Sequence, residues 1–165
     1  MENSGLIRKK DVLLYYGCGK GRMDFFLSYQ TKARTIGIEY DKRIYQGALN
    51  NQKTSVARTR TEIVMARAEV YEVPLEVNRC YFFNPFSVEL LRKVMARILE
   101  SYYEEPREIL LFFYYPSEEY ISYFMTVDEI ELYDEISCED LFEGNNMRER
   151  IMIFTLLSVL SLLNG

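Results

Sequence analysis

Short apolar runs alternate with longer amphipathic segments along this chain of 165 residues. A short run that is apolar throughout is typical of a strand covered on both faces, whereas strict alternation is typical of a strand with one wet face. Ile130 and Leu132 alternate with acidic residues and follow the second pattern. Together these runs predict strands at 12–16, 34–39, 61–66, 79–83, 108–115, 129–133 and 150–157.

Apolar residues at helical spacing mark most of the segments between these strands. The clearest helix follows Ser87, a residue type that favours the N-cap position. Asp41 is placed to begin another helix in the same way. In the first helix we expect Met23, Phe26 and Leu27 to share the inward face. The expected helices cover about 20–29, 42–51, 88–99 and 117–125.

The order of these elements is β-α-β-α-β-β-α-β-α-β-β, and the structure of 67–78 stays open. Strands that alternate with helices predict an α/β fold, a three-layer αβα sandwich with a mostly parallel sheet. The last two strands have no helix between them, so we expect them to pair in an antiparallel hairpin. A polar loop at 140–149 would join them. The length, with no internal repeat or linker, predicts a single domain over 1–165.

The amino-acid composition argues against several kinds of metal and catalytic site. The chain has no histidine and three cysteines without a C-x-x-C spacing, which argues against a Cys/His zinc site, a histidine base and a Ser-His-Asp triad. Unpaired cysteines suit a reducing cytoplasm. The apolar tail 151–163 is shorter than the ~20 residues of a membrane-spanning helix, so we expect a buried strand and no membrane partner. No basic recognition helix supports a nucleic-acid partner.

Three glycines follow the first strand at alternate positions, Gly17, Gly19 and Gly21, and a helical pattern starts at once. Glycine is needed where a backbone turn has positive φ or passes close to a ligand. The second strand ends in Glu39. A glycine turn after one strand and a carboxylate after the next are typical of βαβ units that bind an adenosine, because the carboxylate accepts hydrogen bonds from the ribose hydroxyls.

The spacing G-x-G-x-G differs from the G-x-G-x-x-G of dinucleotide folds, which would need glycine at Arg22. It resembles motif I of the class I S-adenosylmethionine-dependent methyltransferases. The segment 67–69 resembles the adenine-contacting segment of that family, and 84–86 resembles its motif IV. The resemblance implies a Rossmann-like seven-stranded sheet with an antiparallel last strand. It also implies S-adenosylmethionine bound by Tyr16, Gly17, Cys18, Gly19, Gly21, Glu39, Tyr40, Ala68, Glu69 and Asn84.

The resemblance further implies methyl transfer to an acceptor that the sequence does not identify, with Asn84, Pro85 and Phe86 as the catalytic segment. In relatives with this motif, a planar amine is held by the Asn or Asp and stacks near an aromatic ring. Asn84-Pro85 can equally serve only to end a strand and start a helix. The alternatives to an active enzyme are a binding protein with the same fold and weak or no catalysis, and a nicotinamide or other nucleotide enzyme.

Two features depart from the family pattern. Tyr15 occupies the position at which motif I usually has an acid that organises the loop. The first strand begins near residue 11, whereas relatives carry N-terminal helices that cover the cofactor. We therefore expect an open site, a cover supplied by a second copy or another protein, or a shortened form of a longer chain. Cys18, inside the turn, is expected to be inert.

Overall fold

A computed structural model describes residues 5–83, 86–114, 116–137 and 150–157. The expected polar loop at 140–149 lies outside these residues. The strands are β1 (Val12–Tyr16), β2 (Arg34–Glu39), β3 (Thr61–Met65), β4 (Arg79–Phe82), β5 (Leu110–Tyr114), β6 (Ile130–Ser137) and β7 (Arg150–Leu156). The helices are α1 (Arg22–Thr31), α2 (Lys42–Thr54), α3 (Val88–Glu104) and α4 (Glu118–Phe124).

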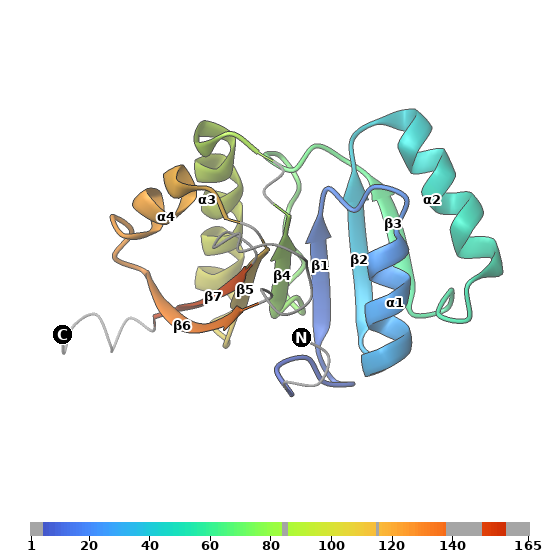
Figure 1. The fold of residues 1–165 in the computed structure, drawn as a ribbon, viewed down its shortest axis with the longest axis horizontal. Coiled ribbons are helices and arrows are strands. Elements are labelled where there is room, and N and C mark those ends of the chain that lie inside the picture. The colour runs from blue at the N-terminus through green and yellow to red at the C-terminus, as the bar shows by residue number, and fades with distance from the viewer. Residues whose placement is uncertain (1–4, 84–85, 115, 138–149, 158–165) are drawn as a thin grey trace.

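The strands form one seven-stranded sheet in the order β3-β2-β1-β4-β5-β7-β6 (Figure 1). The first five strands are parallel, and β7 is antiparallel to both β5 and β6. The predicted order of elements and the antiparallel end are therefore confirmed. Residues 67–78, which the sequence left open, contain turns between β3 and β4.

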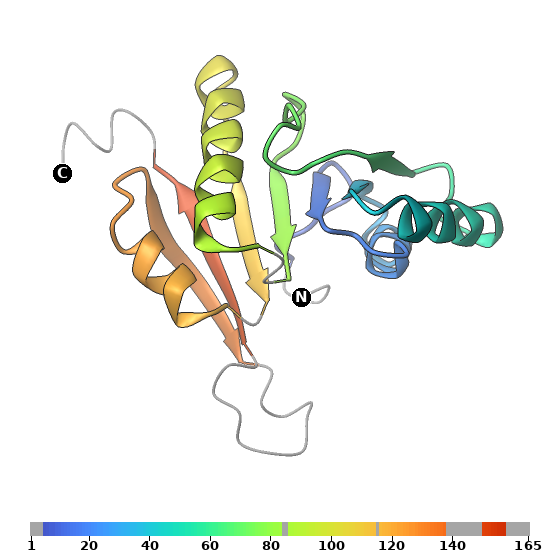
Figure 2. The ribbon, with the colours of Figure 1, turned by 90° about the horizontal axis from the view of Figure 1, so that it is seen from above.

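Helices cover both faces of the sheet. Figure 2 shows α1 and α2 on one side and α3 and α4 on the other. Two hydrophobic clusters correspond to these layers: one contains Leu27 and Ala48 from the first pair of helices, and the other contains Val94 and Tyr120 from the second pair. The predicted three-layer αβα sandwich is confirmed.

Most of the helix starts follow the predicted caps. The Asp41 carboxylate accepts hydrogen bonds from the amides of Arg43 and Ile44, at 2.9 and 3.1 Å. The Ser87 hydroxyl accepts one from the amide of Leu90 at 3.3 Å. These bonds satisfy amides that the first turn of a helix leaves without a partner.

The predicted inward face of α1 was wrong in part. Leu27 is buried, but Met23 and Phe26 are 37% and 47% exposed. The helix presents Asp24 and Ser28 to the sheet with Leu27. A carboxyl fits this position because the facing strand has only glycine, Gly37, at the point of contact. Leu132 of β6, predicted to face inward, is also largely exposed, next to an irregularity in the β6–β7 register.

Aromatic side chains stack across the middle of the sheet. Tyr16 of β1, Phe82 of β4 and Phe113 of β5 are fully buried, and the ring centroids of successive members lie 4.7 and 4.4 Å apart. Such stacking adds to the free energy gained by burial. These rings join the central strands on the α3 side of the sheet.

Among the described residues, no helix has the length and apolar character needed to cross a membrane.

Replacing Phe82 by alanine is expected to lower the free energy of unfolding by about 3–5 kcal/mol, because a buried ring is lost and a cavity remains. Phe83→Ala is the matched control: this ring is 52% exposed, so the loss should be about 1 kcal/mol or less. Equilibrium unfolding in urea measures both values. Equal losses would contradict the burial of Phe82 in the aromatic stack.

Candidate functional site

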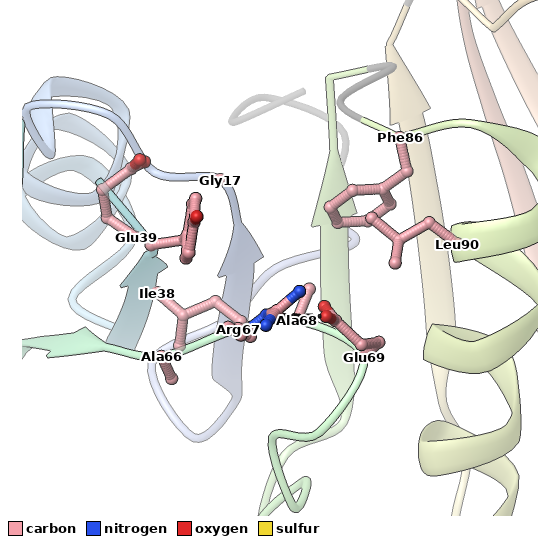
Figure 3. Close-up of a pocket in the computed structure, with 10 residues that line it drawn as sticks. Gly17, Ile38, Glu39, Ala66, Arg67, Ala68, Glu69, Phe86 and Leu90 are labelled. Carbon is pink, nitrogen blue, oxygen red and sulfur yellow. Dashed lines mark ion pairs between the residues drawn. The ribbon is translucent and has the colours of Figure 1, made fainter.

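A pocket of about 480 Å³ lies where the parallel strands end, and we refer to it as the strand-end pocket. The carboxyl ends of parallel strands in such sheets are the usual place for a ligand. In Figure 3, Glu39 and Gly17 stand across the pocket from Phe86 and Leu90. The wall consists of Gly17, Ile38, Glu39, Tyr40, Ala66, Arg67, Ala68, Glu69, Phe86 and Leu90.

The turn from β1 to α1 depends on its glycines. Gly17, Gly19 and Gly21 have φ angles of 67°, 59° and 78°, in the left-handed region that glycine adopts without strain. The turn is fastened to the neighbouring strand, since the Cys18 amide donates a hydrogen bond to the Ile38 carbonyl at 2.9 Å. The predicted reason for the glycines is therefore confirmed.

The Glu39 carboxylate joins the glycine turn to the start of α2. One oxygen accepts a hydrogen bond from the Gly19 amide at 3.0 Å, and the other accepts one from the Asp41 amide at 3.2 Å. An ionised carboxylate offers about four acceptor positions. Two therefore remain available to donors in the pocket, so Glu39 can hold the turn and still bind a diol.

The segment after β3 forms a charged side of the pocket. Arg67 and Glu69 make an ion pair with an N–O distance of 2.8 Å. The Arg67 guanidinium also lies 5.6 Å from the centre of the Tyr40 ring, a cation–π distance. Because Arg67 is largely exposed, the ion pair contributes little to stability. The contact between Arg67 and the Tyr40 ring links the segments that follow β3 and β2, and so defines one edge of the pocket.

Phe86 forms the apolar side, and its backbone is held by Tyr120 of α4. The Phe86 amide donates a hydrogen bond to the Tyr120 hydroxyl at 2.9 Å, and that hydroxyl donates to the Phe86 carbonyl at 2.5 Å. The Phe86 ring meets the rings of Tyr16 and Phe82 edge-on. Its backbone and ring are both fixed, which is the preorganisation that a binding surface needs.

The structure brings six of the predicted site residues together in the wall of the strand-end pocket: Gly17, Glu39, Tyr40, Ala68, Glu69 and Phe86. Gly19 touches the site through its bond to Glu39, and Gly21 precedes α1. Tyr16 is buried in the core against Phe82, and its hydroxyl has no hydrogen-bond partner within the part of the chain that the structure describes. Asn84 and Pro85 lie outside the described residues. The binding and catalytic roles stay predictions.

Sequence reasoning missed several residues of the site. Ile38, Ala66 and Leu90 line the pocket although their patterns indicated only strand, strand-end and helix-core positions. Arg67 was noticed within its segment but not assigned to the site. Tyr120 lies far from Phe86 in the sequence, and nothing in its amphipathic helix indicates that it holds that backbone.

Cys18 in the turn and Tyr15 of β1 are both buried. Burial, followed by the nearby carboxyls of Asp24 and Glu39, raises the pKa of the Cys18 thiol. The thiolate is therefore disfavoured, in agreement with the expected inert role. Burial and the Asp24 carboxyl also raise the pKa of Tyr15, whose ring stacks on Tyr81 with centroids 4.7 Å apart. Tyr15 is part of the packed layer under the turn.

Comparison with known proteins identifies the fold. No protein-family model matches the chain, and no curated protein sequence matches it. The chain does match solved structures. A TehB-like SAM-dependent methyltransferase from Corynebacterium glutamicum superposes with a TM-score of 0.66 at 13% identity, covering 95% of this chain and 85% of that one.

Two further solved structures superpose as well. An RNA methyltransferase from Salinibacter ruber, in complex with S-adenosyl-L-homocysteine, has a TM-score of 0.58 at 17% identity, covering 91% of this chain and 83% of that one. A dimethyladenosine transferase from Plasmodium falciparum has a TM-score of 0.62 at 14% identity. There, 98% of this chain spans only 61% of the other. The fold is thus the Rossmann-like methyltransferase fold.

Gly21→Ala is expected to destabilise the chain more than Gly19→Ala. Both changes force alanine into a left-handed φ, at a cost of about 1–2 kcal/mol each. A Cβ at Gly21 would also lie 3.0 Å from the Phe25 ring, whereas one at Gly19 meets nothing within 4 Å. Thermal unfolding of the two variants measures the difference. The opposite order would contradict this geometry of the turn.

Proposed function

We propose that the chain binds S-adenosylmethionine in the strand-end pocket and transfers its methyl group to an acceptor that is not identified. The observation that carries this proposal is the Glu39 carboxylate, which holds the Gly19 amide and keeps two acceptor positions for a ribose diol. The methyltransferase fold of the chain supports the same function.

The residues of the pocket fit an adenosine with an amino-acid tail. The turn after β1 has no side chain at Gly17 or Gly19, so its backbone can lie close to the tail. Ile38, Ala66 and Ala68 offer an apolar surface for the adenine ring. A volume of about 480 Å³ is within the usual range for a small-molecule site.

When bound, S-adenosylmethionine supplies a methyl group on a sulfonium centre, which an acceptor atom takes by in-line displacement. The part of the protein is to fix the position of the donor, orient the acceptor and exclude water. Glu39 and the glycine turn would hold the donor, and Phe86, fixed by Tyr120, would form an apolar side of the reaction space. None of these roles needs a histidine.

Asn84, Pro85 and Phe86 are proposed as the segment that meets the acceptor. Phe86 is the member of this segment among the described residues, and its ring lies in the pocket wall. Turnover measured with labelled S-adenosylmethionine and a cell extract would establish activity, and full activity of an Asn84→Ala variant would exclude this role for Asn84.

A binding protein with the same fold and little catalysis is the second candidate. The observation that favours it is Tyr15, an uncharged, buried ring where related enzymes usually have an acid. Binding of S-adenosylhomocysteine without methyl transfer to any fraction of an extract would favour this candidate. We also propose that a second copy or another protein covers the site. A cytoplasmic location is a further proposal, because Cys18 and Cys80 are unpaired.

Glu39→Ala is expected to weaken the binding of S-adenosylhomocysteine at least about 100-fold, because it removes two charge-assisted hydrogen bonds to the ribose, each of which contributes about 1.5–3 kcal/mol. Isothermal titration calorimetry measures the change. Glu62→Ala is the matched control, since this exposed acid of β3 pairs with Arg34 and is not in the pocket wall.

The same titration with NAD separates the two nucleotide classes. Tight binding of NAD and none of S-adenosylhomocysteine would replace the proposal with a nicotinamide enzyme. Unchanged affinity of Glu39→Ala for S-adenosylhomocysteine would remove the ribose assignment.

A further inference from the structure

Asp24 is an acid that the fold buries completely. It lies in the first turn of α1, has no exposed surface, and points toward the sheet with Leu27 and Ser28. Among the described residues, neither carboxyl oxygen has a hydrogen-bond partner. Burying a polar group without a partner is unfavourable, so such a residue calls for an explanation in a ligand or a neighbouring group.

The carboxyl lies directly under the glycine turn. A Cβ placed on Gly37 of β2 would be 2.9 Å from the Asp24 Oδ2 atom and 2.9 Å from the Cys18 sulfur. The missing side chain at Gly37 therefore makes the space that the carboxyl and the thiol share. Tyr15 pairs with Gly37 in the β1–β2 register, so it faces the same space from the other strand.

The groups around this carboxyl are acidic or neutral. Tyr15 from β1 and Cys18 from the turn interact with it electrostatically, and the Glu39 carboxylate from the end of β2 interacts with Cys18. No cation is recorded against Asp24 among the described residues. Burial raises the pKa of Asp24 well above its usual range, because it disfavours the charged form of the carboxyl.

A cation above the turn would supply what the carboxyl lacks. The proposed ligand has two cationic groups, the sulfonium and the ammonium of its amino-acid tail, and the ammonium is the one kept in the product S-adenosylhomocysteine. The adjoining turn has the open backbone to receive that tail. An opposite charge nearby favours the ionised form of a buried carboxyl, and the effect is strong where water is excluded. The buried acid and the cationic ligand would therefore stabilise each other across the turn.

We propose that Asp24 is a positioning residue for the amino-acid tail of the ligand, and that it supplies from α1 the negative charge that Tyr15 does not supply from β1. This inference rests on the proposed function. It gives the unpartnered carboxyl a partner that is present only in the complex, and it explains why α1 turns an acid rather than Met23 or Phe26 toward the sheet.

The test compares two ligands that differ only at the tail. S-Adenosylhomocysteine carries the ammonium, whereas 5′-methylthioadenosine has the same adenosine and thioether without an amino-acid tail. Asp24→Asn keeps the shape of the side chain but cannot ionise. Calorimetric titration of the 165-residue chain should show the affinity of Asp24→Asn for S-adenosylhomocysteine at least about tenfold lower, and its affinity for 5′-methylthioadenosine changed by less than about twofold.

Asp11→Asn is the matched control. Asp11 is a buried acid immediately before β1, at the end of the strand away from the glycine turn, and it has its own partners in Arg8 and Asn78. Its replacement should leave the ratio of the two affinities unchanged. Thermal unfolding of Asp24→Asn should show no loss of stability, because an uncharged amide of the same shape replaces an acid whose charged form burial disfavours.

A second variant moves the carboxyl instead of removing it. The double substitution Tyr15→Asp and Asp24→Asn places one acid on β1 against the same Gly37 space. It should regain affinity for S-adenosylhomocysteine relative to Asp24→Asn alone. A double variant no better than Asp24→Asn would contradict a role for charge at this place.

Two results overturn the inference while the proposed function stands: an Asp24→Asn chain that binds S-adenosylhomocysteine as the unmodified chain does, or one that loses both ligands to the same extent. An unmodified chain that binds neither ligand removes the proposed function, and the inference with it.

Discussion

The hydrogen bond between the Gly19 amide and the Glu39 carboxylate is the contact on which the rest of the site depends. It ties the turn after β1 to the end of β2, and the Cys18–Ile38 backbone bond reinforces the link. The turn can take this form because its glycines accept positive φ angles. The acid proposed to bind the ligand thus also determines the shape of the turn that borders the pocket.

The two halves of the strand-end pocket are built by different means. On the β1–β2 side the backbone is held by hydrogen bonds to Glu39, and the surface is polar. On the β4–α3 side Phe86 is held by ring contacts with Tyr16 and by the Tyr120 hydroxyl. The aromatic stack that stabilises the middle of the sheet therefore also supports the apolar wall of the site, so fold and site share the same core.

The layer under the turn combines residues that stabilise the fold with one that does not. Tyr15 packs on Tyr81, and Cys18 is held as a neutral thiol, so both add to the buried layer. Asp24 is unpartnered in the same layer. Local conflicts of this kind concentrate at functional sites, because a site must hold groups whose partner is present only in the complex.

The sequence by itself determined the order of elements, the antiparallel end of the sheet, and the place of Gly17 and Glu39, because strand periodicity, glycine spacing and caps such as Asp41 are local signals. Only the tertiary structure decided what lies under and across the turn. Whether Asp24 faces inward depends on the gap at Gly37, and whether Tyr120 holds Phe86 depends on how α4 packs. Such contacts join residues distant in sequence, and no local pattern encodes them.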